Sequence, residues 1–207
     1  MEIYAGVDEV GTGALAGPVI AVCVKMPLMK GEWPISEVKD SKQTTGAQRD
    51  RLDKVLVEFI EQRRGGGIGI GIAPVTLINE IGHKAALQSA YRQATEMVCA
   101  NGYPTLLIVD GDVGVDGYPK PQRIVPKADA DYFIVAAASI IAKLYRDDLM
   151  VELDLKHSAY GWRTNVGYGT SAHIEALRRL GPCAEHREKA VKTALRKYQE
   201  KKDVFRR

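Results

Sequence analysis

The sequence predicts an α/β fold with additional helices at its C-terminal end. Two observations lead to this expectation: short apolar runs typical of buried strands alternate with segments whose apolar residues recur at helical spacing. No internal repeat and no long polar linker divides the 207 residues. We therefore expect residues 1–207 to form a single domain, with about 160–207 as a helical extension.

Each element follows from a local pattern. The predicted strands cover residues 3–7, 19–24, 68–72, 105–109 and 123–125. The predicted helices cover residues 48–62, 74 to about 82, 83–99, 131–155, 171–180 and 185–202. The third strand alternates isoleucine with glycine, which indicates an edge position or close packing. The small residues of 136–139 would let the longest helix approach the sheet closely.

The adjacent acids Asp8 and Glu9 follow an apolar run and precede a glycine-rich turn. Burying two carboxylates is costly unless a partner compensates their charge, and the usual partner of clustered carboxylates is a hard cation such as Mg²⁺. Neighbouring strand residues point to opposite faces. If both acids serve one site, we expect the strand to end or bulge between them. Two such cations would favour phosphoryl transfer on a nucleic acid.

Other acids compete for this site. Asp110 ends an apolar strand, but Asp-Gly is also a turn signal, and Asp112 follows closely on the loop. Asp129 precedes the longest predicted helix, where it could simply cap the N-terminus. Asp147 is expected to be ion-paired or solvated within that helix. The spacing alone leaves open which acids join Asp8 and Glu9.

The composition is that of an ordinary globular protein with a net charge of +3. No apolar stretch is long enough to span a bilayer, and the first residues lack the layout of a signal peptide. Three widely spaced cysteines are expected to be free thiols in the cytoplasm. Residues 185–207 hold nine Lys or Arg against four Asp or Glu, which is either a solvated helix face or a contact for a phosphate backbone.

A series of short motifs resembles ribonuclease HII, in the order that this family shows. The motifs are Gly6–Gly11, Ala16–Pro18, Asp40–Lys42, Val109–Gly111, Lys127–Asp129, Ala136–Lys143, Arg146–Asp147, Gly167–Tyr168 and Glu185–Arg187. The resemblance implies a ribonuclease H-like mixed sheet flanked by helices. It also implies an endonuclease that hydrolyses the RNA strand of RNA/DNA hybrids and incises at ribonucleotides embedded in duplex DNA. The expected products carry 3′-hydroxyl and 5′-phosphate ends, and a monomer is expected.

The family's site residues carry over by position. The resemblance implies that two divalent cations, Mg²⁺ or Mn²⁺, are bound by four catalytic acids: Asp8, Glu9, Asp110 and Asp129. It implies substrate contacts at Gly11, Thr12, Gly13, Lys42 and Tyr168. The glycine turn would recognise the ribose 2′-hydroxyl through its backbone. Tyr168 would stack at the DNA–RNA junction, and Lys42 would lie near the phosphate backbone.

The chain departs from the family pattern at three places. Thr12 stands where type HII enzymes usually have arginine, and Gly-Thr-Gly is instead typical of ribonuclease HIII. Because the metal motif begins at residue 8, we expect type HII, without the N-terminal substrate-binding domain of type HIII. Gly169 replaces the usual proline, and Glu188-Lys189-Ala190 replaces the usual Arg-Ser-Phe.

Two other functions are consistent with the same fold. The first is a non-catalytic protein that binds hybrids, which would lack divalent-dependent cleavage. The second is a structure-selective DNA nuclease or resolvase, which would prefer branched DNA without RNA. The four acids and the glycine turn favour the ribonuclease.

Overall fold

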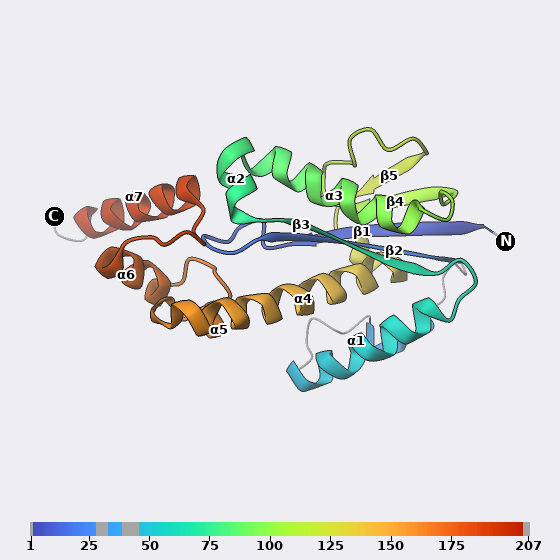
Figure 1. The fold of residues 1–207 in the computed structure, drawn as a ribbon, viewed down its shortest axis with the longest axis horizontal. Helices are drawn as coiled ribbons and strands as arrows, with labels where there is room; N and C mark the ends of the chain where they lie inside the picture. The colour runs from blue at the N-terminus through green and yellow to red at the C-terminus, as the bar shows by residue number, and fades with distance from the viewer. Residues whose placement is uncertain (1, 28–32, 39–45, 205–207) are drawn as a thin grey trace. The chain divides into compact units, whose positions relative to one another are not determined.

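The computed structural model describes residues 2–27, 33–38 and 46–204 of the chain (Figure 1). The strands are β1 Ile3–Val10, β2 Val19–Pro27, β3 Gly67–Ala73, β4 Leu106–Asp110 and β5 Gln122–Val125. The α-helices are α1 Gly46–Glu61, α2 Val75–Ile81, α3 His83–Cys99, α4 Phe133–His157, α5 Trp162–Asn165, α6 Ser171–Leu180 and α7 Glu188–Val204. No described helix is long and apolar enough to cross a membrane.

The chain divides into two compact units, each made of several segments. We name the first the sheet unit: Met1–Val10, Ile20–Ile72 and Leu87–Tyr145. We name the second the helical unit: Gly11–Val19, Ala73–Ala86 and Arg146–Arg207. The helical unit therefore contains the glycine-rich turn that follows β1 as well as the C-terminal helices.

The sheet unit is built on five strands in the order β3-β2-β1-β4-β5. β1 pairs antiparallel with β2 and parallel with β4, and β4 pairs parallel with β5. The sheet is therefore mixed, as the resemblance implied, and the predicted strands are confirmed. β1 and β4 end side by side, which brings the acids at their ends to one edge of the sheet.

Helices cover both faces of the sheet, α3 on one and α1 and α4 on the other (Figure 1). The packing is close where the sequence has small residues. A Cβ on Gly6 would lie 2.8 Å from the backbone nitrogen of Val135 in α4, and a Cβ on Gly71 of β3 would meet the carbonyl oxygen of Ala90 in α3. Both expectations for the isoleucine–glycine strand are confirmed, because β3 is also an edge strand.

The helical unit has its own apolar core. Its buried side chains come from the glycine-rich segment, α4, α5, α6 and α7: Leu15, Met150, Tyr160, Trp162, Leu177 and Val191 among others. The predicted helix start at residue 185 is wrong, since α7 begins at Glu188. Residues 185–187 instead pair with the glycine-rich segment: the N–H of Gly17 donates to Glu185 O at 2.9 Å, and that of Arg187 donates to Leu15 O at 2.8 Å.

Candidate active site

Asp8 and Glu9 lie near the end of β1 and face opposite sides of the sheet. β1 continues through both residues to Val10, in unbroken pairing with β2, where Asp8 is opposite Val22 and Glu9 opposite Ala21. The expectation that the strand ends or bulges between the two acids is therefore wrong. Because the turn begins only after Val10, the side chains keep the alternation of a regular strand.

Asp8 lies on the face that α4 covers. Its side chain is buried and receives a hydrogen bond from Ser139 of α4, while its Oδ1 accepts the N–H of Glu9 at 2.7 Å. Burial above all, together with the nearby carboxylates of Glu9 and Asp110, raises the pKa of Asp8 to about 7 against the lowering effect of the hydrogen bond from Ser139. A cation beside Asp8 would oppose this effect by favouring the ionised form.

Glu9 lies on the face that α3 covers. The hydroxyl of Tyr91, a buried residue of α3, donates a hydrogen bond to Glu9 Oε2. Burial raises the pKa of Glu9, and Asp110 acts in the same direction against the hydrogen bond from Tyr91. Burial and the charge of Glu9 also raise the pKa of Tyr91, so its hydroxyl remains a donor at neutral pH.

Asp110 ends β4, next to the end of β1. Its Oδ1 accepts the backbone N–H of Ala128 at 2.7 Å, which ties β4 to the short 3-10 helix η3, Ala128–Ala130. Asp129 is the middle residue of η3, which ends before α4 begins at Phe133, so Asp129 is not the N-cap of α4. Asp112 lies exposed in the following loop. The structure thus holds Asp110 against the residue that precedes Asp129.

The carboxylates interact electrostatically but are not gathered around one point. In the described part of the chain, no three His, Cys, Asp or Glu side chains are grouped so that they could hold a metal ion. The contacts above explain this, since Ser139 and Tyr91 hold Asp8 and Glu9 on opposite faces. Carboxylate oxygens are the donors that a hard divalent cation prefers. Asp8, Glu9, Asp110 and Asp129 could contribute such oxygens, although the structure does not gather three of them around one point.

In the helical unit, two buried arginines hold the glycine-rich segment. Arg146 of α4 donates to the carbonyl oxygens of Pro18 at 2.9 Å, Ala16 at 3.0 Å and Val166 at 2.8 Å. Gly11 has a φ of +86°, and a Cβ there would overlap the guanidinium of Arg146. Only glycine fits at this position, both for its backbone angle and for the space available.

Arg187 binds the same segment from its other end. Its Nε and Nη2 donate to Gly17 O at 3.0 and 2.8 Å, and its Nη1 donates to Thr12 O at 3.3 Å. Burial lowers the pKa of Arg187 to about 10, with Arg146 acting in the same direction, so the side chain stays charged at neutral pH. The two guanidinium groups together fix the backbone of the turn that was predicted to read the substrate.

Tyr168 lies beside this turn. It sits in the loop between α5 and α6, and its partly exposed ring is 5.5 Å from the guanidinium carbon of Arg146. A Cβ on Gly13 would lie 3.9 Å from the ring. The structure therefore brings together four of the five predicted substrate-contacting residues: Gly11, Thr12, Gly13 and Tyr168. Lys42 lies outside the described residues.

A pocket of about 150 Å³ opens next to Thr12. Its lining includes the buried guanidinium of Arg187, the exposed Lys189 and the side chains of Asn79 and His83. Burial and the charge of Arg187 lower the pKa of His83, so this imidazole is mostly neutral at pH 7. Arg187 and Lys189 bring two positive charges to the pocket, and Glu188 brings one negative charge to the same lining.

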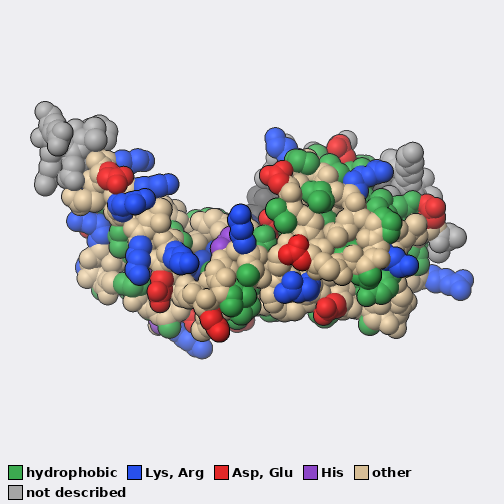
Figure 2. Space-filling model, turned by 90° about the horizontal axis from the view of Figure 1, so that it is seen from above, with side chains coloured by type: hydrophobic (Ala, Val, Ile, Leu, Met, Phe, Trp, Pro, Cys, Tyr) green, Lys and Arg blue, Asp and Glu red, His purple; other side chains and the backbone are tan. Residues whose placement is uncertain are grey.

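Exposed basic side chains are concentrated on the last two helices. Figure 2 shows Lys and Arg side chains gathered near the C-terminal end of the described chain. On α7 these are Lys189, Lys192, Arg196, Lys197, Lys201 and Lys202. Arg178 of α6 pairs with Glu175 at 2.8 Å and lies over the ring of Tyr198, which links the two helices.

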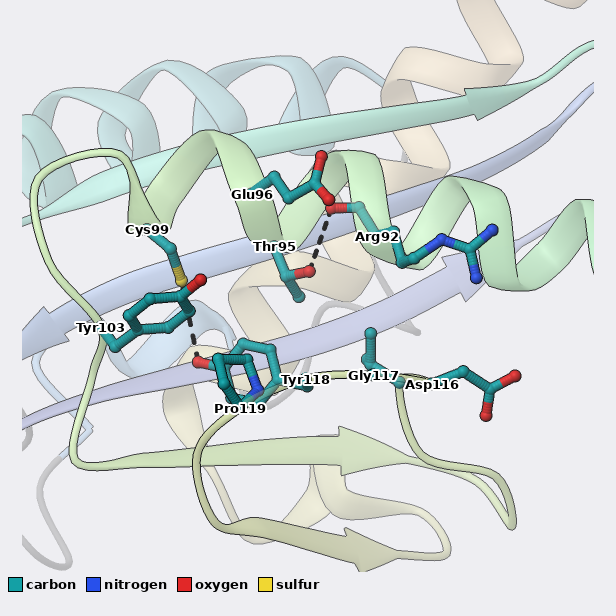
Figure 3. Close-up of a pocket in the computed structure, with 10 residues that line it drawn as sticks. Arg92, Thr95, Glu96, Cys99, Tyr103, Asp116, Gly117, Tyr118 and Pro119 are labelled. Atoms are coloured by element: carbon teal, nitrogen blue, oxygen red, sulfur yellow. Dashed lines mark hydrogen bonds between the residues drawn. The ribbon is translucent and has the colours of Figure 1, made fainter.

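A smaller pocket of about 80 Å³ in the sheet unit lies away from any residue that the sequence singled out (Figure 3). Cys99 of α3 and Tyr118 face each other across it, with Sγ and the hydroxyl 3.7 Å apart. Burial raises the pKa of both groups, so neither is a nucleophile at neutral pH.

The structure adds four residues whose roles sequence reasoning missed: Tyr91, Ser139, Arg146 and Arg187. The last three lie within the recognised motifs, but their contacts depend on segments far away in the sequence. A signal was available for Arg146, since a charged residue on the apolar side of a helix needs a buried partner. Tyr91 gave no such signal, because a tyrosine on a helix face usually packs in the core.

Comparison with known proteins agrees with this arrangement. A sequence model of the family described as Ribonuclease HII matches residues 5–197. The ribonuclease HII of Synechococcus sp. is 39% identical over 191 residues, covering 90% of this chain and 80% of that protein. The crystal structure of ribonuclease H2 from Pyrococcus horikoshii superposes with a TM-score of 0.71 at 24% identity, over 95% of this chain and 99% of that one.

A second solved structure is that of Bst-RNase HIII in complex with Mn²⁺, with a TM-score of 0.67 at 20% identity. It covers 94% of this chain and 69% of that one. At these identities the two structural likenesses support the fold, and the sequence matches carry the family. The chain therefore belongs to the ribonuclease HII family of endoribonucleases, which cleave RNA in RNA/DNA hybrids and at ribonucleotides embedded in DNA.

Proposed function

We propose that Asp8, Glu9, Asp110 and Asp129 bind two divalent cations, Mg²⁺ or Mn²⁺, and that the reaction takes place on them. The observation that carries this proposal is the buried Asp8, whose pKa of about 7 reflects burial and two neighbouring carboxylates. Groups with strongly perturbed pKa values and charged neighbours occur preferentially at functional sites, which supports a role for Asp8 as a metal ligand. Metal-dependent hydrolysis is general to the family, and Bst-RNase HIII was solved with Mn²⁺.

The chain's own residues prepare this site for the cations. Ser139 and Tyr91 hold the carboxylates of Asp8 and Glu9 by hydrogen bonds, as outer partners of metal ligands commonly do. Asp8 must lose its proton to act as a ligand, so cation binding should weaken as pH falls. Bound cations would activate the attacking water and stabilise the leaving 3′-oxygen, giving 3′-hydroxyl and 5′-phosphate ends.

Recognition of ribose is assigned to the helical unit. The 2′-hydroxyl distinguishes RNA from DNA, and the backbone of Gly11 to Gly13 can approach it closely because two of the three residues lack a Cβ. Arg146 and Arg187 support this role by fixing the turn. Tyr168 beside the turn provides a stacking surface for the junction nucleotide.

Phosphate contacts are assigned to basic groups of the same unit. The pocket beside Thr12 offers Arg187 and Lys189 to one backbone phosphate, although the family's usual Arg-Ser-Phe is missing there. The exposed cations of α7 would meet phosphates further along the duplex. Lys42 is proposed to lie near the phosphate backbone of the substrate only because its motif resembles that of the family.

We further propose that the enzyme acts as a monomer in the cytoplasm on hybrids and ribonucleotide-containing duplex DNA. Residues from about 160 to 207 would act as its substrate-binding extension. The three cysteines are free, and two of them are buried, which suits a reducing compartment.

One cleavage experiment tests the proposed function. The substrates are a long RNA/DNA hybrid, a DNA duplex with one ribonucleotide, and an all-DNA duplex and junction, each with Mg²⁺, Mn²⁺ or EDTA. We expect divalent-dependent cleavage of the first two substrates only, with 5′-phosphate products. Cleavage of the all-DNA junction, or binding of the hybrid without cleavage in either metal, would contradict the proposal.

A further inference from the structure

Two buried histidines of the helical unit have no part in the proposed chemistry. His173 lies on α6, His186 lies just before α7, and their side chains are 0% and 2% exposed. Their Nε2 atoms are 3.1 Å apart. The rings of Tyr160 and Trp162 enclose the pair, with centroids 4.6 and 5.2 Å from that of His186. Two buried titratable groups in direct contact need a defined proton arrangement.

The neighbouring donors determine where the protons lie on each ring. The backbone N–H of Cys183 donates to His186 Nδ1 at 3.0 Å, so this nitrogen carries a lone pair and a neutral His186 has its hydrogen on Nε2. The indole N–H of Trp162 donates to His173 Nε2 at 3.2 Å, so a neutral His173 has its hydrogen on Nδ1. The two histidines are therefore opposite tautomers.

With this assignment the hydrogen bonds run in one direction. His186 Nε2–H points to His173 Nε2, which shares its lone pair between this donor and Trp162. His173 Nδ1–H donates to the carbonyl oxygen of Tyr168 at 3.0 Å. A positive charge on either ring would turn an accepting nitrogen into an N–H group that faces another N–H donor, which is unfavourable. Burial also lowers the pKa of both histidines, that of His186 to about 4.

The end of this chain of hydrogen bonds is the backbone of the proposed stacking residue. The carbonyl of Tyr168 accepts a second hydrogen bond from the N–H of Thr170 at 2.8 Å, so both its lone pairs are used. The hydroxyl of Thr170 in turn accepts the backbone N–H of His173 at 3.3 Å. His173 thus holds the loop through its backbone and its imidazole together.

The loop needs such support because of its glycines. Gly167 has a φ of +83°, and Gly169 stands where the family usually has proline. Glycines on both sides of Tyr168 raise the entropy cost of holding the ring in one orientation. Arg146 lies over the ring and donates to Val166 O, so it restrains the loop from the other direction.

We propose that His173 and His186 are positioning residues for Tyr168, acting as a pair of neutral, opposite tautomers that fix its backbone carbonyl. The inference rests on the proposed role of Tyr168 as a substrate contact. His186 holds His173 in the tautomer that donates to Tyr168, and His173 transmits the restraint to the loop.

The tautomers can be measured without an activity assay. Long-range ¹H–¹⁵N spectra of the uniformly labelled protein at pH 7 distinguish Nδ1–H from Nε2–H imidazole and from imidazolium. We expect His173 as the Nδ1–H form and His186 as the Nε2–H form. A charged ring, or the opposite tautomer at either residue, overturns the proposal whatever the substrate activity.

A matched pair of variants tests the effect on the enzyme. In His173→Asn the side-chain amide can still donate to Tyr168 O, whereas in His173→Gln the longer side chain can satisfy Trp162 but not Tyr168. We expect His173→Gln to lower kcat/KM on the single-ribonucleotide duplex about tenfold, the size expected for one lost hydrogen bond, and His173→Asn to keep most of it. Thermal unfolding of both variants controls for stability.

Tyr168→Ala separates the two levels of the inference. If His173 acts through Tyr168, His173→Gln should cause no additional loss in the Tyr168→Ala background. Loss of activity in Tyr168→Ala together with equal activity of the two His173 variants overturns the positioning role and leaves the proposed function intact. Unchanged activity in Tyr168→Ala overturns both the positioning role of the histidines and the proposed role of Tyr168 as a substrate contact.

Discussion

The carboxylate site of the sheet unit and the glycine-rich turn of the helical unit handle buried charge in opposite ways. Asp8, Glu9 and Asp110 place like charges near one another, which contributes to the raised pKa values of Asp8 and Glu9. Arg146 and Arg187 are fully buried, whereas Glu9 and Asp110 are half-buried, and the N–H groups of both arginines are directed at backbone carbonyls. The first arrangement is proposed to be completed by a cation, while the buried arginines of the second are paired by the chain itself.

The difference separates two kinds of expected mutational effect. A neutral substitution among the carboxylates removes the charge of a proposed metal ligand, so it should abolish activity. It also relieves repulsion between neighbouring carboxylates, so it should not unfold the protein. A neutral substitution of a turn arginine leaves several carbonyls without donors, so it should reduce stability as well as recognition. Measuring both the activity and the stability of a variant at each position therefore shows whether the charged side chain binds a ligand or stabilises the fold.

The largest effect is expected from Asp110→Asn. The amide keeps an oxygen for the N–H of Ala128, so the fold should survive, but the ligand loses its charge. Loss of several kcal/mol of transition-state stabilisation would lower kcat by about 10³-fold or more. Steady-state cleavage of a long hybrid measures this. The control is Asp112→Asn in the exposed loop, and the assignment of Asp110 is wrong if that variant is the inactive one.

In contrast to a carboxylate variant, Arg187→Met should mainly reduce the stability of the protein. The variant removes the donors to Gly17 O and Thr12 O and leaves the carbonyl of the buried Gly17 without them, which should cost about 3 kcal/mol in the free energy of unfolding. Urea denaturation measures the loss. Arg196→Met is the matched control, since Arg196 forms an exposed pair with Glu200 at 3.7 Å and should cost under about 0.5 kcal/mol. Equal stability of the two variants would argue against the role of Arg187.

Asp8→Asn should stabilise the metal-free protein in a pH-dependent manner. Because the pKa of Asp8 rises from 3.8 to about 7 on folding, its ionised form is less favourable in the folded chain, and stability falls as pH rises between these values. The substitution removes this penalty. We expect a gain of about 4 kcal/mol above pH 7 and little gain near pH 4, measured by urea denaturation in EDTA. A gain that is the same at both pH values would show that charge is not its cause.

Truncation after Tyr198 should affect binding and leave the chemistry unchanged. It removes four basic residues: Lys201, Lys202, Arg206 and Arg207. We expect a severalfold rise in KM, a shallower dependence of binding on salt and an unchanged kcat. A full-length variant with glutamine at these four positions controls for chain length. Binding that is unaltered across a salt series would mean that this segment is a solvated tail.

The smallest effect is expected at Thr12. A threonine there lacks the charge of the family's usual arginine, which should matter most where a single 2′-hydroxyl anchors the strand. We expect the native protein to prefer long hybrids, and Thr12→Arg to raise single-ribonucleotide incision a fewfold relative to them. Thr12→Gln controls for side-chain length. The idea fails if the native protein already cuts both substrates equally well and Thr12→Arg leaves the ratio unchanged.

Local patterns in the sequence predicted most elements and the acids at the strand ends. Asp8 and Asp110 could be found because each interrupts or ends an apolar run. The continuation of β1 through Asp8 and Glu9 to Val10 was not predicted, because the end of a strand depends on its pairing with β2 and not on its own residues. The late start of α7 has a similar cause, since residues 185–187 pair with a segment about 170 positions earlier.

The supporting contacts of the site were harder to predict. Tyr91 and Ser139 reach the carboxylates only because α3 and α4 cover opposite faces of the sheet. The roles of Arg146 and Arg187 depend on carbonyl groups, which every residue has and no sequence pattern reveals. The resemblance to a family indicated which residues matter, and the three-dimensional contacts indicate why.

The close contact between β3 and α3 has a consequence for reading any survey of sequence variation or saturation mutagenesis in this family. A Cβ at Gly69 or Gly71 would overlap a carbonyl oxygen of α3, at Ala94 and Ala90 respectively. Neither glycine touches the proposed site, yet both should tolerate replacement as poorly as the proposed catalytic acids do. If related sequences had only glycine at these positions, the cause would be the lack of space at this edge strand. Such conservation should not be taken as evidence of a catalytic role.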